Sequence, residues 1–315
     1  MNYSSKYSKL WNLSPDVIYL NHGSFGACPK EISDYQNEIR LKLEEQPMKF
    51  FLREADELLF NSKKILGDFV GANPDNLVFV PNVTHGVNTV LNSLNLNSND
   101  HILITDHIYF ACKNTVEFIS AKTGAKIDIA NVDFPAKSKN NIIEAILSKV
   151  NSKTRIALID HVTSPTGIIF PVAEIVKELN AKNIDIIIDG AHSPGMIPLN
   201  IEAIGAAYYT GNCHKWICSP KGAGFLYVRP DKQKGINPLA ISHFPGDGFT
   251  PLTDFQYKFS WSGTQDVSAY ISVGKAINFM NNILDGGWNE VMNNNKKLAL
   301  KAQKILCNTL IGIIA

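Results

Sequence analysis

The chain has 315 residues, with 30 Lys and Arg against 29 Asp and Glu, which gives a formal net charge of +1. Hydrophobic residues make up 45% and charged residues 19% of the chain, so the composition excludes a largely disordered protein. The balanced charge argues against nucleic acid or an acidic membrane as the main partner. No run reaches the roughly 20 apolar residues of a membrane helix. The N-terminus has no apolar signal segment, so we expect a cytoplasmic protein.

The N-terminal part of the chain is predicted to be irregular at first and then helical. Prolines and glycines break up the first thirty residues. From Glu31 to Val70 the apolar residues approximate helical spacing, with a break at Pro47.

After Pro74 short β-rich runs alternate with helical stretches. This alternation predicts βαβ units around a mainly parallel sheet flanked by helices, an α/β fold. The candidate strands are Leu77–Val80, His101–Thr105, Lys126–Ala130, Arg155–Ile159, Ile184–Ile188, Ala206–Tyr209 and Gly224–Val228. The helical stretches lie near 84–94, 109–121, 141–150, 171–181, 265–283 and 287–306.

Ligands of an open parallel sheet bind at the carboxyl ends of its strands, so the residues that follow each strand are the first candidates for a site. After the first strand, Asn82 or Thr84 can cap the next helix, whose free N–H groups form an anion site. After the second strand comes an aromatic corner that contains His107 and Tyr109. Taken alone, plain helix capping and side-chain packing explain these two features better.

Two charged residues follow later strands. Asp189 comes directly after three isoleucines, where an unpaired charge would be costly, so it needs a partner. Lys215 follows a short apolar strand and precedes a glycine-rich turn. Partial burial and nearby cations would lower the pKa of this lysine, which suits Schiff-base chemistry. A structural aspartate and a solvated lysine are the ordinary alternatives.

In combination these features would bind a phosphorylated pyridine aldehyde. The phosphate would lie at the helix N-terminus, an aromatic side chain or imidazole would cover the ring, and Lys215 would form the imine. Asp189 would pair with the protonated ring nitrogen and keep it cationic. Such a cofactor is an electron sink for a carbanion.

Six short motifs agree with this interpretation. They are Tyr19–Gly26, Asn82–Thr84, Asp106–Tyr109, Asp189–His192, Gly211–Trp216 and Trp261–Thr264. With them the sequence resembles the class V aminotransferase family of fold-type-I pyridoxal-phosphate enzymes. It is most similar to the isopenicillin-N-epimerase-like branch, which is related to cysteine desulfurases. The resemblance implies the pyridoxal-phosphate transferase fold, with a mainly parallel sheet of the seven-stranded type, and pyridoxal 5′-phosphate as the cofactor.

The resemblance also assigns roles to single residues. It makes Lys215 the Schiff-base lysine and Asp189 the partner of the pyridine nitrogen, and it places His192 near the ring 3′-oxygen. The ring-stacking position falls at His107 or Tyr109, and Tyr109 is favoured for this branch.

Further residues follow from the same resemblance. The residues implied at the phosphate are Thr84, His85, Asn212 and His214. Gly263 and Thr264 are implied to reach the phosphate of the neighbouring subunit in a homodimer. Asn21 and His22 are implied on the substrate side, and Ser164 at the cofactor oxygen or the substrate. No metal site is predicted, because the five scattered cysteines form no C-x-x-C pair.

The family pattern divides the chain into an N-terminal arm (1–14), a large cofactor domain (15–260) and the start of a small C-terminal domain (261–315). Relatives carry a carboxylate-binding arginine in the C-terminal segment, but this sequence has no arginine after Arg229. Lysines lack the bidentate fork of that side chain. We therefore expect the small domain to be incomplete at its apolar end, Leu310–Ala315.

The functional prediction is an enzyme that acts at the α-carbon of an amino acid or amino-acid conjugate, with Lys215 as general base. The shared carbanion leads to epimerisation, which we favour, to elimination by a C–S lyase, or to transamination. A cofactor-binding protein without catalysis is the alternative from another class. A cysteine desulfurase is disfavoured, because no cysteine falls on a late loop. Nucleotide-binding and serine-hydrolase functions are also disfavoured, since neither G-x-G-x-x-G nor G-x-S-x-G follows a strand.

Overall fold

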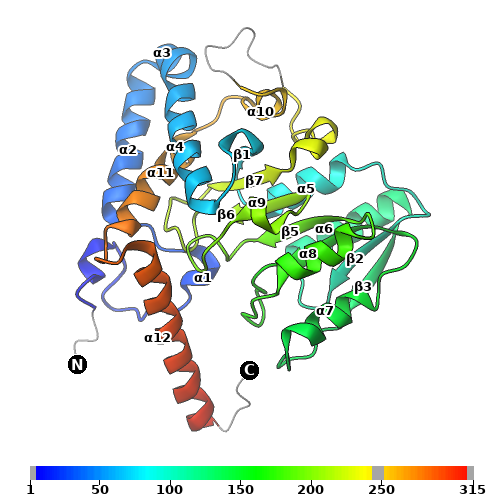
Figure 1. Ribbon diagram of the computed structural model, residues 1–315. Helices are drawn as coiled ribbons and strands as arrows, with labels where there is room; N and C mark the ends of the chain where they lie inside the picture. The colour runs from blue at the N-terminus through cyan, green and yellow to red at the C-terminus, as the bar shows by residue number, and fades with distance from the viewer. Residues whose placement is uncertain (1–4, 243–251, 311–315) are drawn as a thin grey trace.

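A seven-stranded sheet runs through the centre of the protein (Figure 1). The structure is a computed structural model that describes residues 5–242 and 252–310. The strands are β1 (Leu77–Val80), β2 (His101–Thr105), β3 (Lys126–Ala130), β4 (Thr154–Asp160), β5 (Asp185–Gly190), β6 (Tyr208–Asn212) and β7 (Gly224–Val228). Their order across the sheet is β1-β7-β6-β5-β4-β2-β3. Strands β3, β2, β4, β5 and β6 run parallel to one another, whereas β7 is antiparallel to both β1 and β6. The mainly parallel α/β fold is confirmed.

Alternation along the strands divides the core into two layers. Ile187 on β5 packs with apolar residues of α5 (Val83–Ser93) and α6 (Phe110–Thr123) on one face of the sheet. Its neighbours Ile186 and Ile188 pack on the other face with α8 (Val172–Asn180). This is the two-residue period of a strand that is buried on both sides. The helices α7 (Lys139–Leu147) and α9 (Ile201–Ile204) complete that second face.

A group of helices stands beside β1, at one end of the sheet (Figure 1). It consists of α2 (Lys30–Glu45), α4 (Ala55–Val70) and α11 (Ser268–Asn281). Ser62 on α4 joins this group, because its hydroxyl donates to the Tyr270 carbonyl at 2.7 Å and accepts from the Gly274 amide at 3.0 Å. The prediction that residues 31–70 form helices broken at Pro47 is confirmed, with α3 (Pro47–Lys49) and a π-helical turn (Phe50–Glu54) between α2 and α4.

Segments from the two ends of the chain lie side by side. The Lys275 ammonium forms an ion pair with Glu31 at 2.7 Å, and the rings of Trp11 and Phe279 meet edge to face at 6.3 Å. After α10 (Asp254–Phe259) and α11, the long helix α12 (Gly287–Leu310) extends away from the sheet (Figure 1). The short helix α1 (His22–Phe25) and the 3-10 turns Ser8–Leu10, Pro74–Asn76 and Pro230–Gly235 complete the described elements. The division into an arm, a large domain and a small domain stays a prediction.

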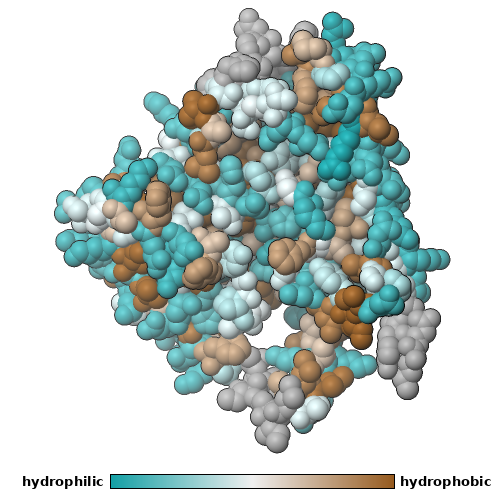
Figure 2. Space-filling view, turned by 180° about the vertical axis from the view of Figure 1, so that it is seen from behind, coloured by the Kyte–Doolittle hydropathy of each residue, from teal (hydrophilic) through white to brown (hydrophobic). Residues whose placement is uncertain are grey.

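The surface is mixed in character. On the face opposite to that of Figure 1, hydrophobic residues form separate patches among hydrophilic ones (Figure 2). Within residues 5–242 and 252–310, no helix combines the length and the apolar run that crossing a membrane requires.

Candidate active site

The carboxyl ends of three neighbouring parallel strands carry the polar side chains of the site. Asp160 ends β4, Asp189 lies at the end of β5, and Asn212 ends β6, three residues before Lys215. Because these strands are adjacent in the sheet, residues from distant parts of the sequence meet at one edge.

Lys215 and His192 are in direct contact, with Nζ 3.0 Å from Nε2. Burial and then the Lys215 charge lower the pKa of His192 to about 4, so its imidazole is neutral at pH 7. An ammonium group can only donate, so Lys215 donates and His192 accepts. Burial also lowers the pKa of Lys215, and the nearby Asp189 carboxylate opposes this shift. The lysine therefore loses its proton more readily than a solvated lysine would.

The N-terminal segment holds the lysine loop in place. His22 accepts at Nδ1 from the Ala27 amide (3.2 Å), and its Nε2 lies 2.9 Å from the Lys215 carbonyl oxygen. Gly26 has a φ of +49°, and a Cβ there would lie 1.8 Å from the His214 carbonyl oxygen, so only glycine fits. Both ring nitrogens of His22 are thus engaged by the backbone, which gives this residue a positioning role. Its predicted contact with substrate, like that of the exposed Asn21, stays a prediction.

Asp189 is 2% exposed and has a hydrogen-bond donor at each oxygen. Oδ1 accepts from the Ala191 amide at 2.9 Å, and Oδ2 accepts from the Cys112 thiol at 3.2 Å. Burial raises the pKa of Asp189, while these donors and Lys215 oppose the shift. The carboxylate is held rigidly at the strand edge beside Lys215.

The first turn of α5 is arranged to receive an anion. The Asn82 side chain caps the helix by accepting from the His85 amide at 3.0 Å, which settles the choice between Asn82 and Thr84 as the cap. Asn212 Oδ1 accepts from the Val83 amide, also at 3.0 Å. Among the described residues, neither the amide nor the hydroxyl of Thr84 has an acceptor, so both are available to a phosphate.

The two candidates for ring stacking, which lie in the aromatic corner after β2, differ in their exposure to solvent. His107 is buried, with Nδ1 2.8 Å from the Thr166 hydroxyl and Nε2 2.8 Å from the Val132 carbonyl oxygen. Tyr109 is 44% exposed at the start of α6. This arrangement supports Tyr109 as the stacking residue, although stacking itself stays a prediction. Ser164 lies exposed in the turn after β4.

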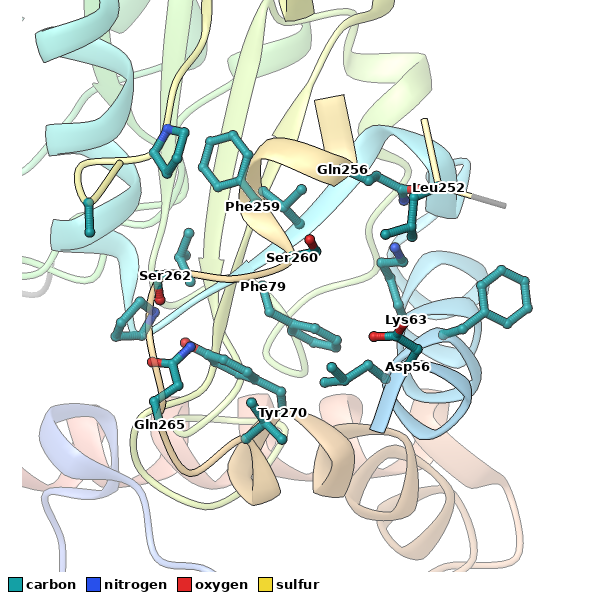
Figure 3. A pocket seen from close by; sticks show the side chains of 18 of the residues that line it. Asp56, Lys63, Phe79, Leu252, Gln256, Phe259, Ser260, Ser262, Gln265 and Tyr270 are labelled. Atoms are coloured by element: carbon teal, nitrogen blue, oxygen red, sulfur yellow. The ribbon is translucent and has the colours of Figure 1, made fainter. Parts of the chain in front are cut away.

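Gly263 and Thr264 lie in the segment between α10 and α11. Within the part of the chain that the structure describes, no hydrogen bond or ion pair joins them to Lys215. The residues on either side, Ser262 and Gln265, line a cavity between α4, β1 and α10 (Figure 3). The helix α5 lies beside both this cavity and the lysine loop, because His85 lines the cavity and the Val83 amide donates to Asn212.

Comparison with known proteins shows which family the chain belongs to. The model of the aminotransferase class-V family matches residues 37–310. The chain belongs to the class V aminotransferase family. The members of this family are pyridoxal-phosphate enzymes, as the sequence motifs predicted.

Individual relatives differ in the reaction that their names give. The chain is 30% identical over 277 residues to the isopenicillin N epimerase of Streptomyces clavuligerus, which covers 85% of this chain and 70% of that protein. It is 28% identical to the hercynylcysteine sulfoxide lyase of Schizosaccharomyces pombe, over 98% of this chain and 79% of the relative. A probable chloroplastic L-cysteine desulfhydrase of Arabidopsis thaliana is 28% identical, over 93% of this chain and 64% of the relative.

A solved structure shares the fold. The cystine C-S lyase C-DES, in complex with its product cysteine persulfide, superposes with a TM-score of 0.74 at 24% identity. The match covers 83% of this chain and 71% of that one.

The residues of this class V site fit pyridoxal phosphate. Thr84 offers a free amide and hydroxyl where a phosphate would lie, and Asp189 offers a buried carboxylate for a protonated ring nitrogen. Lys215 supplies an amine with a lowered pKa near Asp189. These groups therefore fit the phosphate, the ring nitrogen and the aldehyde of the cofactor.

The sequence interpretation missed two residues of the site. Cys112, from the first turn of α6, donates to Asp189 and is fully buried. Asp160 is 2% exposed and lies on the strand next to Asp189. Asp160 had a signal, since it follows Ile156-Ala157-Leu158-Ile159 as Asp189 follows its isoleucines. Cys112 had none, because only the packing of α6 on the sheet brings it to the carboxylate.

Proposed function

We propose that this class V enzyme acts at the α-carbon of an amino acid or amino-acid conjugate, in the manner of an epimerase. The observation that carries the proposal is the contact between Lys215 and neutral His192 beside the buried Asp189. Support for the reaction type comes from the 30% identity to isopenicillin N epimerase.

Each polar part of the cofactor has a residue to hold it. Lys215 would attach it covalently, and Asp189 would pair with its ring nitrogen. His192 would lie near the ring oxygen, and Tyr109 would cover the ring. The phosphate would be held by the first turn of α5 and the lysine loop through Thr84, His85, Asn212 and His214. When bound, pyridoxal phosphate supplies an electron sink that stabilises negative charge at the substrate α-carbon.

The chain itself moves the proton. Once the substrate amine has taken its place, Lys215 is free to accept the proton of the α-carbon. Burial favours the neutral amine that this role requires. His192 accepts a hydrogen bond from Nζ and so keeps the lysine at the strand edge.

Cleavage of a C–S bond is the second candidate reaction. It is favoured by the similarity to the sulfoxide lyase and to the desulfhydrase, whose names imply loss of a sulfur group, which cysteine carries on its β-carbon. Both reactions begin with the same proton transfer, so the same lysine serves either. They differ in what happens next at the β-carbon.

Turnover in heavy water tests the proposal. The purified protein, reconstituted with pyridoxal phosphate, is incubated in D₂O with a panel of amino acids, cysteine, cysteine conjugates and peptidyl amino acids. Epimerisation predicts deuterium at the α-carbon with formation of the opposite enantiomer. C–S cleavage predicts sulfide or a sulfenate together with a keto acid. Bound cofactor without exchange in any substrate would favour a binding protein without catalysis.

We also propose that the protein works as a homodimer in which Gly263 and Thr264 reach the partner's cofactor phosphate. The support is that, among the described residues, neither of them forms a hydrogen bond with Lys215 of the same chain. Ser262 and Gln265 beside them are exposed, as an intersubunit contact requires before assembly.

A further inference from the structure

Two buried carboxyl groups stand side by side under the proposed cofactor site. Asp160 on β4 and Asp189 on β5 are register partners in adjacent parallel strands. Each is 2% exposed. Adjacent strands are about 4.8 Å apart, so two side chains that project to the same face are close neighbours.

The strand period places both carboxyl groups on the same face. Leu158 and Ile187 both belong to the core layer that packs against α5 and α6. Two residues further along each strand, Asp160 and Asp189 continue that face. Their shared environment includes Cys112 of α6.

The donors around the two groups are unequal. Asp189 has a donor for each oxygen and lies near the positive charge of Lys215. The amides of Tyr109 and of Asp160 itself favour the ionised form of Asp160 and so oppose the rise of its pKa, but its Oδ2 is fully buried without a hydrogen-bond partner among the described residues. An ionised carboxylate without a donor at one oxygen is costly to bury, whereas the neutral acid buries no charge.

We propose that Asp160 holds one proton beside Asp189, so that the pair carries a single negative charge and this charge resides on Asp189. Two carboxylates in one buried site do not both ionise readily, and the proton goes to the group with the fewer donors. In this arrangement Asp160 is a positioning residue, which acts on the cofactor through Asp189.

The electrostatics of the cluster agree with this assignment. Burial and the negative charge of Asp189 raise the pKa of Asp160 well above its ordinary value. Burial also raises the pKa of the Cys112 thiol, and the negative charge of Asp189 raises it further, so this group stays protonated and donates. Lys215 favours ionisation of Asp189.

The consequence for the cofactor rests on the proposed function. A single anion on Asp189 would face the ring nitrogen with its full charge. A second anion on Asp160 would make removal of the Asp189 proton harder, and a neutral pair would leave the ring nitrogen without a counter-charge. The protonated Asp160 therefore fixes where the negative charge lies.

Infrared spectroscopy of the cofactor-free protein tests the proton directly. At pH 7 the carbonyl band of a protonated aspartic acid is expected, and labelling with ¹³C-aspartate should shift it. Asp160→Asn should abolish the band, and Asp133→Asn, which removes an exposed carboxylate, should keep it. Absence of the band, or its persistence in Asp160→Asn, would overturn the proposal. This test needs no cofactor, so its failure is distinct from failure of the proposed function.

Titration with pyridoxal phosphate tests the location of the charge. Asn resembles the protonated acid, so Asp160→Asn should keep the cofactor Kd, and the pH dependence of the bound cofactor's visible absorption, within about threefold. Asp160→Ala should weaken binding by about tenfold and shift that pH dependence, because Asp189 loses its neighbour. A tenfold loss in Asp160→Asn as well would show that Asp160 must be charged, which contradicts the proposal. An unchanged Asp160→Ala would also contradict it, because Asp160 would then have no influence on Asp189.

Discussion

At the scale of single residues, Asp189 is the group on which the chemistry of the site depends. Its two oxygens are held by the Ala191 amide and the Cys112 thiol, so it cannot turn away from the strand edge. The sequence predicted its need for a partner from the isoleucines before it. The identity of its partners came only from the structure, because α6 is distant in sequence.

Replacement of Asp189 should separate attachment of the cofactor from turnover. In Asp189→Asn the cofactor still attaches to Lys215, but turnover falls by about 100-fold or more, because the ring nitrogen loses its charged partner. Absorption spectra and steady-state rates on the best substrate measure the two effects. Asp133→Asn serves as the control for loss of one exposed carboxylate. Unchanged turnover in Asp189→Asn would refute the role.

Lys63 is a second residue with an altered pKa, away from Lys215. It is 8% exposed on α4 and faces the cavity near Asp56 (Figure 3). Burial lowers its pKa to about 8, against the attraction of Asp75 and Asp56. Between pH 8 and the 10.5 of an ordinary lysine, the unfolded chain binds more protons than the folded one. The free energy of unfolding therefore gains a rising contribution from this group across that range.

Lys63→Met should remove this pH dependence. At pH 7 the variant should be more stable by about 1–3 kcal/mol, since no charge is buried, and most of this gain should be lost by pH 10, as the pH approaches the pKa of the unfolded lysine. Urea denaturation at both pH values measures it, and Lys64→Met, at the exposed neighbouring position, is the matched control. Equal stability of Lys63→Met and the parent at pH 7 would contradict the assignment.

At the scale of elements, the helix α5 links the fold to the cofactor site. Gly86 lets it approach β6 closely, because a Cβ there would lie 2.2 Å from the Thr210 hydroxyl. The Asn82 and Asn212 side chains bind two of its first amides and leave that of Thr84 open. The end of this helix that faces the site is therefore fixed before any ligand arrives.

Removal of the cap should affect both stability and cofactor binding. Asn82→Ala should lower the free energy of unfolding by about 1 kcal/mol and raise the Kd for pyridoxal phosphate by about tenfold. Asn200 caps α9 in the same way, because its Oδ1 accepts from the Ala203 amide at 2.9 Å, and Asn200→Ala removes this cap. The Asn200→Ala variant should lose a similar free energy of unfolding but keep the Kd for pyridoxal phosphate unchanged. Equal effects of the two variants on the Kd would contradict a phosphate site at α5.

Most elements could be predicted because their signals are local. Periodicity and turn residues marked all seven strands, and β1, β2, β3 and β7 have the predicted bounds. The antiparallel direction of β7 could not be predicted, since pairing depends on contacts between distant segments. The π-helical turn Phe50–Glu54 also had no local signal beyond the break at Pro47.

At the scale of the whole molecule, the N-terminal segment packs against the lysine loop of the large sheet. His22, from the N-terminal segment, fixes the Lys215 carbonyl, and Gly26 packs against the same loop. The N-terminal motif of the sequence thus has a structural reason beyond any contact with substrate. The distance in sequence between His22 and Lys215 explains why no local pattern could predict this pairing.

The proposed homodimer makes a prediction of concentration dependence. If Gly263 and Thr264 hold the partner's phosphate, the affinity for pyridoxal phosphate should fall on dilution below the dimer dissociation constant. Analytical ultracentrifugation and cofactor titration over the same protein concentrations measure the two transitions. Cofactor affinity that is independent of protein concentration across dissociation would count against the shared site.

The central claim is that Lys215 attaches pyridoxal phosphate, and reduction with borohydride tests it most directly. The reconstituted protein should show a visible absorption band that disappears on reduction, and mass spectrometry of its peptides should then find the phosphopyridoxyl group on Lys215. Lys215→Ala should show neither the band nor the modified peptide. A protein that shows no band after reconstitution, or one whose label lies on another lysine, would contradict the account.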